Sequence, residues 1–167
     1  VQKTWEGIMN TPISLDSVLL AELLWAAFKA LFTVTAILLV MLALGISHSP
    51  KLLVAWPVLL CVGVMFSAIA LIFNALAKGY DFFSYYFTLA LTPMVFVSGV
   101  FYPVDGLPRW LSILAGALPL ANAVDLVRPL VLGGWPDQPL RHVAVLIVYT
   151  LGGFYLALVL TRRRFVR

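Results

Sequence analysis

Four long apolar stretches constrain this chain more than any other feature of its sequence. They cover residues 30–46, 52–77, 82–102 and 142–161. Crossing about 30 Å of hydrocarbon takes roughly 20 apolar residues of α-helix, and a helix satisfies its backbone hydrogen bonds within itself. The stretches therefore predict four transmembrane helices.

The composition also indicates a membrane protein. Of the 167 residues, 63% are hydrophobic and 11% are charged, and the mean hydropathy of +1.05 lies outside the range of soluble domains. The apolar stretches are too long for the alternating strands of an outer-membrane barrel. We therefore predict an all-α fold, a polytopic helical bundle that forms one transmembrane domain over residues 1–167. The net charge of +4 does not indicate nucleic-acid binding, because much of it lies in the terminal TRRRFVR.

The lysines and arginines of the connections predict the orientation. If the N-terminus is inside, seven of these residues lie on the inner side and four on the outer side. Cytoplasmic loops carry the excess of such residues, so we expect both ends of the chain in the cytoplasm. The loop ISHSPK and the long segment 103–141 then lie outside.

An outer re-entrant hairpin is predicted over residues 108–133. The apolar stretch at 111–124 is broken by Pro119 and carries Asn122, so we expect two short helices that enter and leave one leaflet. A surface loop lying on the membrane is the alternative. Asp125 and Arg128 are three positions apart and are expected to form an ion pair on one helical face, with substrate contact as the other possibility.

The turn into this hairpin has its own signals. Gly99 and Pro103 are expected to end the third span, and Phe101 to anchor it at headgroup level. The glycine and prolines that follow, up to Pro108, would turn the chain back toward the membrane.

Residues 1–26 are predicted to be a cytoplasmic connection. Pro12 and Ser14 would start an amphipathic helix, with Ser14 as its N-cap, and this helix would run into the first span. Such a helix can lie on lipid or can receive force from a soluble partner, and the periodicity fits both.

Motifs of other functions are absent from the sequence. It has no nucleophile elbow and no GxxxxGK[ST] phosphate loop, and His48 and His142 lie far apart with no cysteine nearby, so neither a metal site nor a cofactor is expected. Transport would need energy from another protein. A membrane enzyme that does not transport, or an assembly scaffold, is the alternative class.

Two segments resemble one family. TWEGIMNTPIS at residues 4–14 resembles the cytoplasmic loop that precedes the third span of ABC type-2 permeases. SGVFYPVDGLPRWL, followed by LPLANAVDLVRPLVLGG, resembles the outer segment between that family's fifth and sixth spans. Within the family, the chain is most similar to the permeases that export nodulation factors, which are lipo-oligosaccharides. Exporters of polysaccharides and drugs are near relatives of that subgroup.

The resemblance implies the permease subunit of an ATP-driven exporter in the bacterial cytoplasmic (inner) membrane. It implies a separate ATP-binding subunit, a second permease copy that is either identical or different, and membrane lipid as partners. The residues that would dock the ATPase are Trp5, Glu6, Thr11, Pro12 and Ser14. An outer cap over the exit path would include Gly99, Phe101, Pro103, Pro108, Asp125 and Arg128. Members of the family usually have six spans, so the chain is expected to be a C-terminal fragment with the last four.

Overall fold

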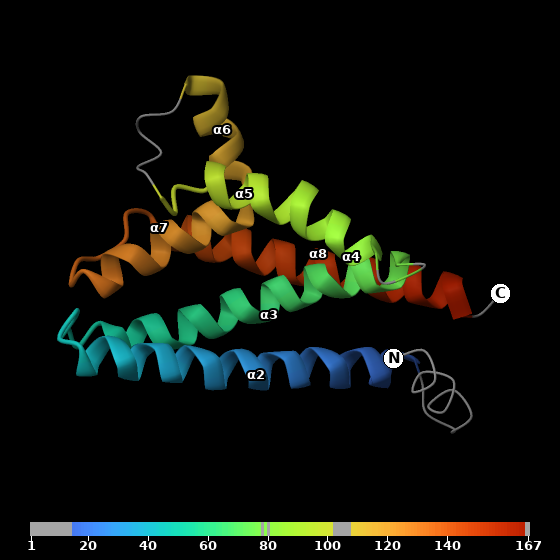
Figure 1. The fold of residues 1–167 in the computed structure, drawn as a ribbon, viewed down its shortest axis with the longest axis horizontal. Helices are drawn as coiled ribbons and strands as arrows, with labels where there is room; N and C mark the ends of the chain where they lie inside the picture. The colour runs from blue at the N-terminus through green and yellow to red at the C-terminus, as the bar shows by residue number, and fades with distance from the viewer. Residues whose placement is uncertain (1–14, 78, 80, 102–107, 166–167) are drawn as a thin grey trace.

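The computed structural model describes residues 15–77, 79, 81–101 and 108–165, and these residues form helices and no strand (Figure 1). The predicted all-α fold is confirmed for this part of the chain. Three helices are long and apolar enough to cross a membrane, namely α2 (Leu15–Ala43), α3 (Leu52–Leu76) and α8 (Pro139–Phe165).

The first long helix, α2, starts well before the first predicted span. It is continuous from Leu15, because its sequence contains neither proline nor glycine, and the expected amphipathic helix therefore merges with the span. It ends at Ala43 instead of residue 46, because Gly45 adopts a φ of +69°, a conformation common just after helix ends.

The third predicted span, residues 82–102, is a shorter helix in three parts. These are α4 (Asp81–Tyr85), the π-helical segment η1 (Tyr86–Leu91) and α5 (Thr92–Val97), a total length near the lower limit for crossing a membrane. Pro93 lacks an N–H and would clash with an α-helical carbonyl one turn earlier. The wider π turn relieves this clash, so the expected kink takes the form of a π segment. The helix ends at Val97 because Gly99 adopts a φ of +78°.

The segment after residue 108 forms two short helices, as predicted. Helix α6 (Arg109–Ala117) and helix α7 (Pro119–Val131) meet at an angle of 85°. Leu118, between them, has extended backbone because a residue that precedes proline is disfavoured in the α region. One straight helix across the membrane is therefore excluded here.

The helix α3 is the centre of the bundle. It packs along α8 and α2, and α7 lies across one end of α3 and α8 (Figure 1). Met65 of α3, Leu126 of α7 and Leu146 of α8 belong to one buried apolar cluster. At the other end of the bundle, Arg162 of α8 forms an ion pair with Asp16 of α2. The described ends of the chain therefore lie side by side.

Replacing Gly63 by alanine is expected to destabilise the bundle. An added Cβ would lie 2.6 Å from the Cβ of Ala30, so α2 and α3 would have to separate, and overpacking of this kind costs about 1–3 kcal/mol. Gly152→Ala is the matched control, because no atom lies within 4 Å of its added Cβ and the gain in helix propensity is the same. Thermal unfolding in detergent should give a lower midpoint for Gly63→Ala. Equal midpoints would contradict the close contact.

Candidate functional site

Side-chain hydrogen bonds join helix α7 to three other segments, and most of these bonds are accepted by backbone carbonyls. The predicted outer cap lies in this region. The contacts fall into three groups, at the C-terminal end of α7, at its bend with α6, and at the end of α5.

The loop between α2 and α3 caps the C-terminal end of α7. The Ser47 hydroxyl donates to the carbonyl of Val131 at 2.6 Å, and the Lys51 ammonium donates to the carbonyl of Gly133 at 2.6 Å. The last carbonyls of a helix have no partner within it, and a cation is favourable there. Lys51 also lies 5.2 Å from the centre of the Trp135 ring. Ser47 and Lys51 thus join the loop firmly to α7.

The bend between α6 and α7 is fixed by Asn122, which is only 1% exposed. Its amide nitrogen donates to the carbonyls of Gly116 at 2.9 Å and Leu118 at 2.8 Å. Because both amide protons are used, the Asn122 oxygen is an acceptor, and His142 of α8 donates to it from Nδ1 at 2.7 Å. The Nδ1 atom of His142 therefore carries a proton.

The third carbonyl of the same turn is bound from α8. The Tyr149 hydroxyl donates to the carbonyl of Ala117 at 2.9 Å. Three successive carbonyls at the bend therefore have side-chain donors. Together with the bond from His142, these contacts fix both the bend angle and the position of α7 on α8.

Arg128 joins α7 to the end of α5. Its guanidinium donates to the carbonyls of Gly99 at 2.5 Å and Val100 at 3.1 Å. The predicted ion pair with Asp125 is wrong, because the ion pair among the described residues joins Arg162 and Asp16, and Asp125 is exposed. The turn at Gly99 leaves carbonyls without helical partners, and these attract the cation instead.

Pro108 and Phe101 are the other described residues of the predicted cap. The carbonyl of Pro108 accepts from the backbone of Leu111 and Ser112 and so begins α6. Phe101 is exposed, and its ring centre lies 5.6 Å from that of Phe96. The remaining predicted site residues lie outside the described residues, and they are Pro103, Trp5, Glu6, Thr11, Pro12 and Ser14.

Sequence reasoning missed most of this framework. The sequence patterns do not single out Ser47, Lys51, His142 or Tyr149 as members of it. Asn122 gave the one available signal, because an amide inside an apolar stretch needs hydrogen-bond partners when it is buried. Among the described residues, no group of three or more His, Cys, Asp or Glu side chains could hold a metal ion.

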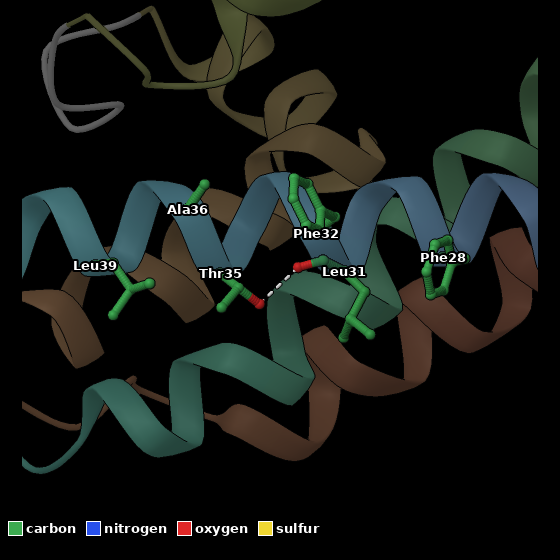
Figure 2. Close-up of a pocket in the computed structure, with 6 residues that line it drawn as sticks. All are labelled: Phe28, Leu31, Phe32, Thr35, Ala36 and Leu39. Atoms are coloured by element: carbon green, nitrogen blue, oxygen red, sulfur yellow. Dashed lines mark hydrogen bonds between the residues drawn. The ribbon is translucent and has the colours of Figure 1, made fainter.

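A shallow cavity of about 210 Å³ lies along α2 alone (Figure 2). Its lining is apolar except for Thr35, whose hydroxyl donates to the carbonyl of Leu31 at 2.7 Å, as the dashed line shows, and accepts from the indole of Trp56. This cavity therefore offers no free polar group to a ligand. A second apolar cavity lies between α3, α5 and α7.

Replacing Asn122 by leucine should destabilise the bend. The carbonyls of Gly116 and Leu118 would lose their donor, and an unsatisfied buried polar group costs about 1–3 kcal/mol. Asp125→Asn, at an exposed position of the same helix, is the control and should leave the unfolding midpoint unchanged. In the unsubstituted protein at neutral pH, the imidazole ¹⁵N resonances of His142 should show a protonated Nδ1. An Nε2-protonated tautomer would contradict the assigned network.

Comparison with known proteins identifies the family. Residues 2–132 match the family model described as "ABC-2 type transporter". Nodulation protein J of Bradyrhizobium diazoefficiens is 40% identical over 167 residues, 100% of this chain and 64% of that protein. Nodulation protein J of Rhizobium leguminosarum bv. viciae is 39% identical over 166 residues, 99% of this chain and 64% of that protein. The chain thus spans just under two thirds of the length of these relatives, and no solved structure matches it. Since the family model covers most of its residues, the chain belongs to the ABC-2 type transporter family.

Proposed function

We propose that this chain is part of the permease subunit of an ATP-driven exporter in the bacterial cytoplasmic membrane. Its substrate would be amphipathic, such as a lipo-oligosaccharide, a polysaccharide or a drug. The observation that carries the proposal is the match of residues 2–132 to the transporter family. Similarity to Nodulation protein J along the whole chain favours a lipo-oligosaccharide, in line with the resemblance seen in the sequence.

The energy for export would come from a separate ATP-binding subunit. The sequence holds no phosphate-binding loop, so this chain would receive force instead of hydrolysing ATP. Two permeases and two ATPases would form the assembly, and the docking residues would be Trp5, Glu6, Thr11, Pro12 and Ser14.

The described residues offer a physical route from the docking segment to the opposite end of the bundle. The helix α2 follows this segment directly and continues without a break for 29 residues. The loop after α2 is bonded to α7 through Ser47 and Lys51. A displacement of α2 along its axis would therefore be passed to α7. In this proposal, α6 and α7 form the outer cap, and residues 81–97 form the third of four spans.

Charge reversal at Glu6 or a bulky side chain at Thr11 should uncouple ATP hydrolysis from export. In the full-length permease with its ATPase in vesicles, Glu6→Lys and Thr11→Trp should retain ATPase activity and lose most export, because the docking surface no longer transmits the movement. Gln2→Glu, outside the motif, is the control. Normal export by both variants would remove the docking role. If the unsubstituted complex shows no export, the transport proposal itself is refuted.

Cysteine accessibility should distinguish the re-entrant cap from a loop on the surface. On a Cys61→Ala background in intact cells, an impermeant reagent should label Asp137→Cys and Trp135→Cys but not Leu114→Cys. Leu114 and Trp135 are 54% and 65% exposed in the isolated chain, so lipid, not protein, would cause the difference.

The same labelling tests the orientation. Lys78→Cys should react only after the cells are permeabilised, because the proposed topology places this connection in the cytoplasm. Labelling at position 78 without permeabilisation would contradict the orientation. Equal labelling at positions 114 and 135 would contradict the re-entrant cap.

A further inference from the structure

The helix formed by α4, η1 and α5 is attached to the bundle at its two ends and stands apart in between. At one end, the ring of Phe73 of α3 lies 4.0 Å from that of Tyr86 and 6.4 Å from that of Phe82, measured between ring centres. At the other end, Arg128 of α7 holds the carbonyls of Gly99 and Val100. Figure 1 shows α4 close to the end of α3 and α5 beside α7.

A cavity of about 460 Å³ lies between these two attachments, and we call it the α3–α5 groove. Its volume is within the range of roughly 300–1,000 Å³ that ligand pockets occupy. Side chains from four elements and from the residue Phe101 line it, among them Phe66 of α3, Phe87 and Leu91 of η1, Phe96 of α5, and Leu120 of α7.

The lining of the α3–α5 groove is hydrophobic. The hydroxyl of Thr92 is its polar side-chain group, and it already donates to the carbonyl of Phe87 at 2.9 Å. A water molecule needs two to four polar partners to be stable in a cavity, and this groove does not supply them. The groove is therefore suited to a hydrocarbon occupant.

The shape of the groove follows the helices. Phe87 and Phe96 both line it and are separated by about 14 Å of helix, at 1.5 Å per residue. The groove thus extends along the axis of a membrane helix, as a lipid tail does in one leaflet. Phe66 lies well inside the membrane-spanning length of α3, so the groove is at the depth of the hydrocarbon.

A positive charge lies next to the end of the groove that Phe101 lines. Phe101, in the lining, directly follows Val100, whose carbonyl accepts from Arg128. Of the three guanidinium nitrogens of Arg128, only Nη2 donates these bonds. The other two have no hydrogen-bond partner among the described residues. Asp125, one turn earlier on α7, is exposed and does not pair with Arg128. An anionic headgroup would complement this arginine.

We propose that the α3–α5 groove binds one acyl chain of an anionic phospholipid from the surrounding bilayer, with the lipid phosphate at Arg128. The lipid would fill the space that side chains leave between α3 and α5. This site does not depend on the identity of the exported substrate.

Photolabelling with lipids tests this proposal. The full-length permease is placed in phosphatidylcholine vesicles with a trace of phosphatidylglycerol that carries a diazirine in its acyl chain. After illumination, mass spectrometry of peptides should find adducts at Phe66 and Met94. The same probe with a phosphatidylcholine headgroup should label these residues less, by about fivefold, which corresponds to ~1 kcal/mol for one cationic side chain facing anionic lipid. Leu151 of α8, which is 66% exposed, is the reference and should react equally with both probes.

Two variants separate the acyl and headgroup contacts. Leu91→Trp fills the groove and should abolish labelling at Phe66 while labelling at Leu151 remains. Arg128→Gln should remove the preference for the phosphatidylglycerol headgroup. Arg128→Lys should retain this preference because the charge remains. If Arg128→Gln does not fold, the headgroup preference of the unsubstituted protein and the Leu91→Trp result still decide whether the groove binds an anionic lipid.

Three outcomes would overturn the proposal. The first is equal labelling of the groove by both probes, and the second is labelling of Phe66 that Leu91→Trp leaves unchanged. The third is labelling that shows no headgroup preference and is lost when a lipo-oligosaccharide is added. That result would assign the groove to an exported substrate instead.

Discussion

The arrangement of this molecule depends on the backbone carbonyls that its bends leave without helical partners. In a low-dielectric environment, each unsatisfied carbonyl costs several kcal/mol, so a short bent pair such as α6 and α7 needs donors from elsewhere. Asn122 and Tyr149 supply them at the bend, and Lys51 supplies one beyond the far end of α7. Arg128 supplies them where α5 ends. Side chains from the α2–α3 loop, α7 and α8 thus replace the backbone bonds that a continuous helix would make.

A mechanical consequence follows from where these donors are located. Because Ser47 and Lys51 belong to the loop between α2 and α3, α7 cannot shift relative to those two helices without breaking bonds to Val131 and Gly133. Tyr149 joins α8 to the same unit. The helices α2, α3, α7 and α8 are therefore expected to move as one body, and the proposed transfer of force from the docking segment to the cap needs such a rigid connection.

The sequence predicted those features of the fold that depend on local patterns. Long apolar stretches indicated α2, α3 and α8, because twenty apolar residues have few alternatives to a membrane helix, and Pro119 indicated the break between α6 and α7. The partner of Arg128 was predicted wrongly, because a spacing of three positions shows only that Asp125 is within reach. Backbone carbonyls have no signature in a sequence, so the contacts of Arg128 and Lys51 become visible only when the elements are placed in space. The π segment and the early end at Val97 likewise depend on the local backbone around Pro93 and Gly99.

Side-chain size explains why one helix stands apart from the others. The pairs α2–α3 and α3–α8 approach closely through small residues, as Gly63 does against Ala30 and Gly153 against Ala68. The sequence of residues 81–97, DFFSYYFTLALTPMVFV, contains no glycine and is rich in aromatic side chains. Helix axes come close only where small residues face each other, so this helix meets α3 through rings and leaves a space beside them. In the proposed topology that space faces lipid, so the bilayer itself would complete the contact between this helix and α3.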